Sequence, residues 1–259
     1  MSQQLTPIST ARLLLQHDLL VFESRTLADL LGIERIRLAR FLQRMEQDGL
    51  VARVERGKYL LLGLEPAQGL ANPLGVASQL VTPSYISFWS ALHFHGLTEQ
   101  APRIVFVAVT RQKRSLTFQG TVFQFVRLMP HMFFGYRRET LAGLSLTVAD
   151  EAKAILDSLY LPGNAGGLTE VAKSLRAALL DGRVEVAQLV EYSRRMRNAS
   201  LAGRLGYLLE RLGQPAVHLP SPRGPIALDP ARPRGGAYDR RWKVYINVSD
   251  EELFPEGVG

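Results

Sequence analysis

The chain has 259 residues, of which 46% are hydrophobic, and a mean hydropathy of +0.01; these values predict a sizeable buried core and two domains. No apolar run approaches the roughly 20 residues of a membrane-spanning helix, and the N-terminus lacks a signal-peptide pattern, so we expect a cytoplasmic protein with no membrane partner. The absence of cysteine excludes disulfides, thiolate metal sites and cysteine nucleophiles, and a net charge of +7 favours a polyanionic partner.

Two short helices are predicted at the start of the chain. Residues 8–20 have the spacing of apolar residues that is typical of a helix. Thr26 is a suitable N-cap for a second helix, with Asp29 three residues later, close to a capping box. Gly32 would end this helix and allow the chain to turn.

A longer helix and a hairpin follow the turn. Glu34 can open the helix and Gly49 can stop it, and its apolar residues fall on one stripe: Leu38, Phe41, Leu42 and Met45. Two β-rich runs, residues 50–55 and 58–62, then flank Arg56 and Gly57, which is a hairpin signal. Helix, tight turn, helix and hairpin in this order predict a winged helix-turn-helix.

The charges on the longer helix predict DNA binding. Four arginines and no acidic residue lie between positions 35 and 44. In a helix-turn-helix the second helix enters the major groove, where the planar arginine fork matches guanine and an apolar side chain can touch a thymine methyl group. The predicted base contacts are Arg35, Ile36, Arg37 and Arg40. The predicted contacts to phosphate or to the minor groove are Arg44 on the helix and Arg53, Arg56 and Lys58 on the wing. Arginine-rich helices are also common on solvated surfaces, so the ordered combination of elements favours this function more than any single residue does.

The predicted fold class is α+β, with an N-terminal winged helix-turn-helix in residues 1–70 and a larger mixed α/β domain in residues 71–259. Residues 1–70 hold nine Arg/Lys and eight Asp/Glu, so most of the net charge lies in the second domain. Three basic clusters carry it: Arg111/Lys113/Arg114, Arg194/Arg195/Arg197 and Arg240/Arg241/Lys243. If they gather beside the wing, they extend the DNA-contacting surface, which we favour; elsewhere they would meet an acidic toxin or RNA, or be solvated.

The second domain is predicted to mix strands and helices. Residues 64–83 have the Gly, Pro, Ala and Asn content of a connector. Residues 84–96 are predicted to form a mostly buried helix that ends at Gly96. The predicted strands are residues 104–110, 116–118, 121–127, 144–148 and 242–248. The predicted helices are residues 150–160, 168–180, 184–195 and 200–212, and residues 215–236 are expected to be irregular.

Three segments of the second domain resemble AbiEi-type antitoxins, which are also described as predicted transcriptional regulators of viral defence systems. In residues 148–173 a strand runs into an acidic helix start, an Ile-Leu-Asp, a Pro, a Gly-Gly and another helix; the others are the Arg-Leu-Gly-Tyr-Leu-Leu-Glu helix of residues 200–213 and the ending Arg-Trp-Lys-Val-Tyr-Ile-Asn. The resemblance implies an antitoxin that represses its own operon by binding inverted repeats in its promoter DNA. It also implies that the C-terminal domain counters a nucleotidyltransferase-like toxin.

Residues that could carry catalysis have simpler interpretations. Glu151 and Lys153 match the Glu-x-Lys of a nuclease core after Asp150, but they open a helix, where acidic residues are favourable anyway. No catalytic residues, metal site or cofactor are predicted. The alternative function is an enzyme, with a nuclease or phosphotransfer activity delivered by a DNA-binding module and dependent on Asp150 or Glu151.

Overall fold

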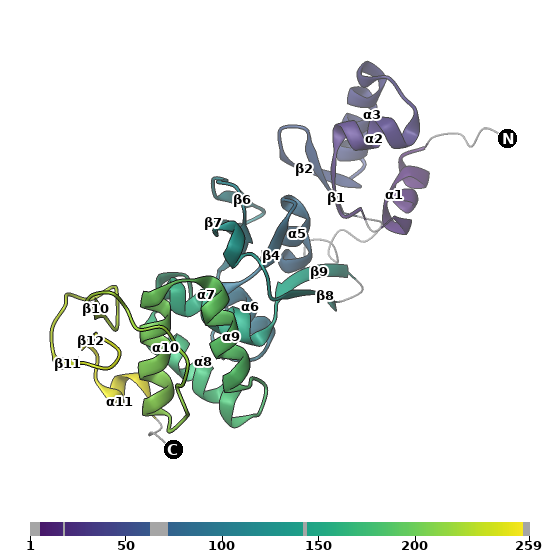
Figure 1. Ribbon diagram of the computed structural model, residues 1–259. Coiled ribbons are helices and arrows are strands. Elements are labelled where there is room, and N and C mark those ends of the chain that lie inside the picture. The colour runs from purple at the N-terminus through teal and green to yellow at the C-terminus, as the bar shows by residue number, and fades with distance from the viewer. Residues whose placement is uncertain (1–5, 18, 63–71, 142–143, 256–259) are drawn as a thin grey trace.

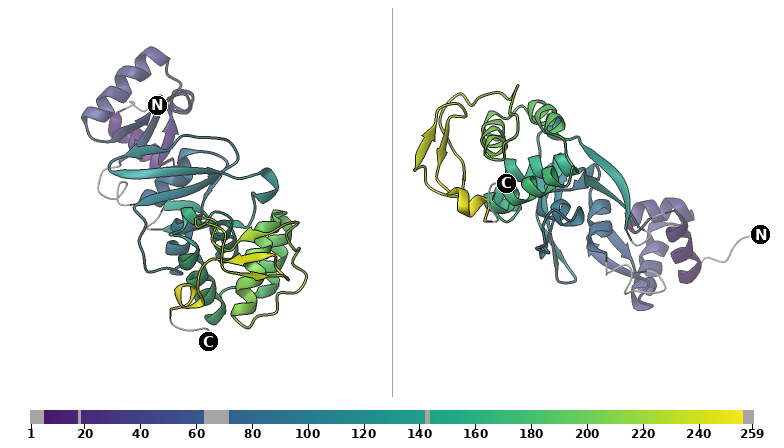
Figure 2. Two further views of the ribbon diagram at one scale, coloured as in Figure 1. Left: turned by 90° about the vertical axis from the view of Figure 1, so that its left-hand side faces the viewer. Right: turned by 90° about the horizontal axis from the view of Figure 1, so that it is seen from below.

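The computed structural model describes residues 6–17, 19–62, 72–141 and 144–255. Within these ranges the protein has ten α-helices and three sheets, which confirms the α+β class. The first six elements lie at one end of the molecule, and a small C-terminal sheet lies at the other (Figures 1 and 2). We call residues 6–62 the N-terminal unit and residues 72–255 the body. No helix in the described ranges is long and apolar enough to cross a membrane.

The N-terminal unit combines three helices with a three-stranded antiparallel sheet of order β1-β3-β2. Its elements are α1 (Pro7–Gln16), β1 (Val21–Glu23), α2 (Ser24–Leu31), α3 (Arg35–Gln47), β2 (Val51–Glu55) and β3 (Lys58–Leu61). The helix predicted for residues 8–20 therefore ends early, and β1 was not predicted. The N-cap assigned to Thr26 was wrong because β1 leads directly into α2, which begins at Ser24 after Glu23.

A compact core holds the three helices of the N-terminal unit on its sheet. Of the predicted stripe of α3, Leu38, Leu42 and Met45 are buried, and Phe41 is partly buried against the same core. They pack with residues of the other elements: Ala11, Leu14, Phe22, Leu27, Ala28, Leu50, Val51 and Leu61. Gly32 ends α2 in the left-handed conformation with a φ of 62°, as predicted, so the chain can turn before α3.

The connector predicted for residues 64–83 is wrong in its second half, where α5 (Pro73–Leu80) forms; residues 63–71 lie outside the described ranges. The Asn and Pro that predicted a loop instead start this helix. The Asn72 side chain accepts a hydrogen bond from the backbone N–H of Gly75 at 3.0 Å, and Pro73 occupies the first turn, where no backbone donor is needed.

Helix α5 joins the N-terminal unit to the body. Apolar residues in or next to the N-terminal sheet enter the core of the body together with those of α5: Leu20, Val21, Val54 and Leu60 with Val76, Ala77 and Leu80. The backbone N–H of Val21 donates to Oε1 of Gln79 at 2.9 Å, and Nζ of Lys58 donates to the carbonyl of Leu80 at 2.7 Å. The orientation of the N-terminal unit is thus set by packing and hydrogen bonds.

The body is built on a six-stranded mixed sheet of order β6-β7-β5-β4-β9-β8. Its strands are β4 (Ser84–Ile86), β5 (Ile104–Val109), β6 (Leu116–Phe118), β7 (Thr121–Arg127), β8 (Tyr136–Leu141) and β9 (Leu144–Ala149). The single helix predicted for residues 84–96 was wrong, because residues 84–86 insert between β5 and β9 as a strand before α6 (Phe88–Phe94). The polar edge strand β8 was not predicted.

Four long helices, a small sheet and a short final helix complete the described part of the body. The helices confirm the predictions: α7 (Glu151–Tyr160), α8 (Leu168–Leu180), α9 (Val186–Met196) and α10 (Ala199–Arg211). The last elements are β10 (Ile226–Ala227), β11 (Ala237–Asp239), β12 (Val244–Ile246) and α11 (Asp250–Leu253). We call residues 226–253 the C-terminal cap; its sheet has the order β10-β12-β11 and lies beside α10 (Figures 1 and 2).

Candidate nucleic-acid interface

The face of α3 opposite its buried stripe carries arginines without partners. Arg35, Arg37 and Arg40 are exposed, and among the described residues none forms a hydrogen bond or an ion pair with them. Arg44 lies 3.9 Å from Asp48 in a solvated pair that is worth little energetically. Ile36, in the first turn, is 74% exposed, more than any other large hydrophobic residue of the described ranges. The face therefore offers charged forks and one apolar side chain, which are the groups that base edges accept.

A groove of about 470 Å³ separates α3 from the turn of the β2–β3 hairpin. The start of α2 closes the third side, where the backbone N–H of Ser24 donates to the carbonyl of Gly57 at 2.8 Å. Gly57 has a φ of 74°, which suits glycine in this tight turn. Three arginines from separate elements line the groove: Arg25, Arg35 and Arg56. Arg25 was not among the predicted contact residues; its place in the first turn of the helix before α3 is the signal that could have indicated it.

The hairpin residues divide into two groups. Arg53 and Arg56 are exposed, and among the described residues they have no polar partner. Lys58 differs, because its ammonium group donates to the carbonyl of Leu80 and lies 3.4 Å from Glu55. Lys58 thus joins the hairpin to α5, and its charge is already engaged within the protein.

One of the three basic clusters lies beside this hairpin. Nζ of Lys113, in the loop between β5 and β6, is 3.0 Å from each carboxylate oxygen of Glu55 on β2. The same ammonium lies 5.2 Å from the centre of the Phe125 ring. Burial alone would raise the pKa of Glu55, but the hydrogen bond and charge of Lys113, together with Lys58, outweigh it and lower the pKa.

The other two basic clusters belong to other parts of the body. Arg195 stacks on Phe134, with 3.9 Å between its guanidinium carbon and the ring centre. Arg241, in the turn before β12, forms an ion pair with Glu210 on α10. The C-terminal cap lies at the opposite end of the molecule from α3 (Figures 1 and 2), so the three clusters do not form one surface.

The nuclease-like residues have separate structural contacts. Lys153 is fully buried and forms an ion pair with the equally buried Asp157. Asp150 caps α7 by accepting the backbone N–H of Lys153 at 2.8 Å, and Glu151 pairs with Arg137 at 3.1 Å. The ammonium of Lys153 is therefore closed off from any substrate in solution. Within the described residues no group of three or more His, Cys, Asp or Glu could hold a metal ion.

The Arg-Leu-Gly-Tyr-Leu-Leu-Glu segment of α10 holds the C-terminal cap. An added Cβ at Gly206 would lie 2.4 Å from the Trp242 ring, so only glycine lets this ring lie against the helix. Glu210 accepts the indole N–H of Trp242 at 2.8 Å. Nε of Arg204 donates to the carbonyl of Leu228 at 3.0 Å, and burial lowers the pKa of this arginine. The residues that carried the resemblance thus have a packing role in this chain.

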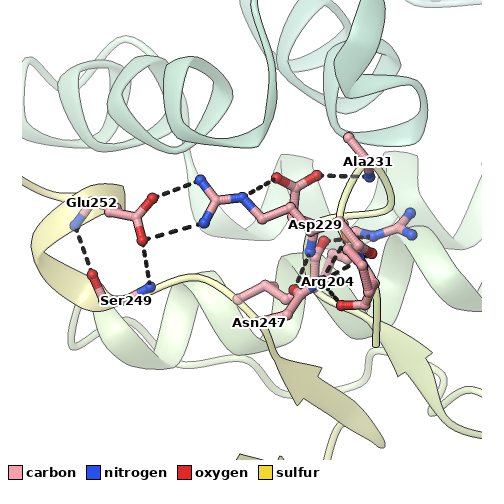
Figure 3. Close-up of polar contacts among 9 residues, drawn as sticks. Arg204, Asp229, Ala231, Asn247, Ser249 and Glu252 are labelled. Carbon is pink, nitrogen blue, oxygen red and sulfur yellow. Dashed lines mark hydrogen bonds and ion pairs between the residues drawn. The ribbon is translucent and has the colours of Figure 1, made fainter. Parts of the chain in front are cut away.

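Asn247 closes the cap from the other side (Figure 3). Its amide accepts the backbone N–H of Asp229 at 2.9 Å and donates to the carbonyls of Asp229 and Pro233 at 2.9 and 3.0 Å. The adjacent Arg232 pairs with Asp229 and with Glu252, which belongs to the capping box at the start of α11. The C-terminal cap is therefore held in place by its own hydrogen bonds as well as by its contacts with α10.

The comparisons with known proteins give a similarity of fold. No family model matches the chain, and no curated protein matches it. The structure is similar to the crystal structure of the RV2827C protein from Mycobacterium tuberculosis, with a TM-score of 0.60 and 15% sequence identity. The similarity covers 93% of this chain and 92% of that chain. The two proteins therefore share a fold that extends from the N-terminal unit to the C-terminal cap.

Proposed function

We propose that the protein is a DNA-binding antitoxin of the AbiEi type that represses its own operon. In this proposal residues 1–70 form a winged helix-turn-helix, with α3 as the reading helix and the β2–β3 hairpin as the wing. Residues 71–259 form the domain that counters a nucleotidyltransferase-like toxin. Such a protein acts in the cytoplasm, where its promoter and its toxin are found.

The observation that carries the DNA-binding proposal is the exposed face of α3, on which Arg35, Arg37 and Arg40 have no polar partner among the described residues. Three guanidinium groups and the 74%-exposed Ile36 lie on one helix, away from its buried stripe. Helix α2, Gly32, α3 and the hairpin follow in the order that a winged helix-turn-helix requires. The assigned base contacts are Arg35, Ile36, Arg37 and Arg40. The assigned backbone contacts are Arg25, Arg44, Arg53 and Arg56, whereas Lys58 is assigned to the junction with α5.

The antitoxin part of the proposal rests on the resemblance of the three body segments to AbiEi-type proteins. Two of those segments hold the C-terminal cap on α10 through Gly206 and Glu210. The resemblance therefore covers residues that shape the body. DNA reading by α3 does not explain the function of the body, and the antitoxin role would supply one. The proposed partners are inverted repeats of promoter DNA and one toxin.

Arg37→Ala/Arg40→Ala tests the DNA-binding half of the proposal. We expect it to weaken binding to the DNA upstream of the gene by about 1–3 kcal/mol for each lost bidentate contact, with a smaller effect on a scrambled duplex. Gel-shift titrations on the two duplexes give both affinities. Arg223→Ala/Arg234→Ala is a matched control, because it removes the same charge from two exposed, unpartnered arginines at the cap end. Equal preference for the promoter in the wild type and the α3 variant would refute the assignment.

The same α3 variant separates the two halves of the function in the full-length chain. A truncated body would expose Val76 and Leu80 of α5, which the N-terminal sheet covers. The full-length Arg37→Ala/Arg40→Ala protein keeps this packing and should still restore growth when the toxin is co-expressed. A folded variant that loses promoter binding and growth rescue together would contradict the division of labour.

A further inference from the structure

The loop between β5 and β6 is held against the β2–β3 hairpin by one residue. Lys113 contacts both carboxylate oxygens of Glu55 and lies over the Phe125 ring, so the centre of the loop is anchored from two sides. Glu55 directly precedes Arg56 and Gly57 of the hairpin turn. The loop of the body therefore lies at the same edge of the molecule as the arginines of the hairpin.

Two arginines lie close to Lys113 in the same loop. Arg111 and Arg114 are exposed and, within the described ranges, have no hydrogen-bonding or ion-pairing partner. They belong to the longest stretch without acids in the body: residues 100–138 contain seven Arg or Lys and no Asp or Glu. In the described part of the chain, the only acidic side chain that forms an ion pair with the loop is Glu55, which Lys113 and Lys58 already neutralise. A positive field thus continues from the hairpin onto the loop.

We propose that the β5–β6 loop is a second phosphate-contacting element, in which Arg111 and Arg114 bind the backbone of duplex DNA beside the hairpin. Lys113 is a positioning residue, which holds the loop at Glu55. The inference rests on the proposed function, because it requires that the hairpin itself lies on DNA. It assigns part of the affinity, though none of the sequence preference, to the body.

Preorganisation and charge both favour phosphate binding by this loop. Arginines on a free loop would lose conformational entropy on binding, whereas an anchored loop has already lost most of it. Phosphate contacts do not depend on sequence, and they fix the register in which a reading helix meets its bases. Each phosphate neutralised on duplex DNA also releases condensed counterions, so log K falls by about 0.9 more per unit of log salt concentration. The loop therefore has a measurable signature distinct from that of α3.

The decisive experiment compares Arg111→Ala/Arg114→Ala with the wild type on the promoter duplex and a scrambled duplex at several salt concentrations. We expect the slope of log K against log salt concentration to become shallower by about 1.8, from two lost phosphate contacts, equally on both duplexes. Preference for the promoter should stay unchanged, unlike in Arg37→Ala/Arg40→Ala. The control Arg223→Ala/Arg234→Ala should keep the wild-type slope on both duplexes.

The possible outcomes separate the two proposals. If the wild type binds DNA and Arg111→Ala/Arg114→Ala keeps its slope and affinity, the loop contacts are refuted while the function of α3 stands. If the wild type binds neither duplex, both proposals fail. A loss that is equal in the loop variant and the control variant would show a bulk charge effect and would also overturn the loop contacts.

Glu55→Gln tests the positioning role of Lys113, because this role and the change in net charge predict opposite effects on DNA affinity. Removing an acidic group beside DNA should strengthen binding if only net charge matters. We expect weaker binding on both duplexes and a shallower slope, because the loop loses its anchor. Stronger binding in Glu55→Gln would overturn the positioning role.

Discussion

The exposed face of α3 and the buried cluster of α7 use charged residues in opposite ways. On α3 the guanidinium groups of Arg35, Arg37 and Arg40 are solvated, and no described residue pairs with them. On α7 the ammonium of Lys153 is fully buried against Asp157. The second carboxylate oxygen of Asp157 accepts hydrogen bonds from Tyr85 on β4 at 3.0 Å and from Ser87, the N-cap residue of α6, at 2.7 Å.

The difference shows that solvent exposure determines whether a charged side chain stabilises the fold or can bind a partner. A charge in water costs little and stays available, so it can be given to a partner such as phosphate. A buried charge must be neutralised and hydrogen-bonded in place, because its desolvation is expensive. Burial lowers the pKa of Lys153 and raises that of Tyr85 well above its ordinary value, the latter with help from Asp157. We therefore expect changes in the two regions to affect different measurements.

The largest expected effect on stability is in the α7 cluster. Asp157→Asn leaves Lys153 buried without a counter-charge, and removing one partner of such a pair typically destabilises a protein by about 3–5 kcal/mol. Urea unfolding followed by circular dichroism gives this free energy. Arg44→Ala is the control, since it removes an equivalent i,i+4 pair that is solvated, and it should change stability by less than about 0.5 kcal/mol. If both variants lost the same free energy of unfolding, the buried pair and the solvated pair would not differ in their contribution to stability.

A second effect is expected where α10 meets the cap. Gly206→Ala places a methyl group within 2.4 Å of the Trp242 ring, so the ring must move and Glu210 loses its indole donor. Overpacking of this kind typically costs about 1–3 kcal/mol. Trp242 fluorescence and urea unfolding report the change. Gly163→Ala serves as the matched control, because no atom lies within 4 Å of the added Cβ there. An unshifted fluorescence spectrum in Gly206→Ala would contradict the packing role of the motif.

The β2–β3 hairpin carries both kinds of charge, since Lys58 is engaged within the protein and Arg56 is solvated. Lys58→Ala removes the hydrogen bond to Leu80 and should lower the unfolding free energy by about 1 kcal/mol, with a minor effect on the salt slope of DNA binding. Arg56→Ala should leave stability unchanged and make that slope shallower by about 0.9. The two measurements on both variants form a crossed design. If Lys58→Ala made the salt slope shallower by as much as Arg56→Ala does, Lys58 and Arg56 would not have different roles in the hairpin.

The smallest expected effect is on pH dependence at the junction. The pKa of Glu55 is lowered in the folded protein, so its ion pair with Lys113 stabilises the fold above the ordinary glutamate pKa. This stabilisation is lost as the pH falls through the lowered value, because the carboxylate then takes up a proton. Unfolding free energies measured between pH 6 and about pH 3 should fall less steeply in Glu55→Gln than in the wild type. Parallel curves for the two proteins would show that the pair contributes nothing to the junction.

The sequence by itself determined the elements that depend on neighbouring residues. The stripe of α3, the turn at Gly32, the hairpin at Gly57 and helices α7 to α10 follow from periodicity and turn residues, and these were predicted. The residues proposed to contact DNA could be named for the same reason, because they lie on one helix and one hairpin. Strands β1, β4, β8, β10 and β11 were missed, the fourth of them inside residues 215–236, which were expected to be irregular. Such short strands are stabilised by pairing with other strands, which local sequence does not show.

Only the tertiary structure decided what three lysines with the same charge do. Lys153 meets Asp157, which also accepts a hydrogen bond from Tyr85, 72 residues away, and Lys113 meets Glu55 across 58 residues. Lys58 was predicted to contact DNA, but folding brings it to the carbonyl of Leu80 on α5. Local sequence fixes the charge of each group, whereas its desolvation and its partner depend on long-range packing, and these determine whether the charge stabilises the fold or stays available to a ligand.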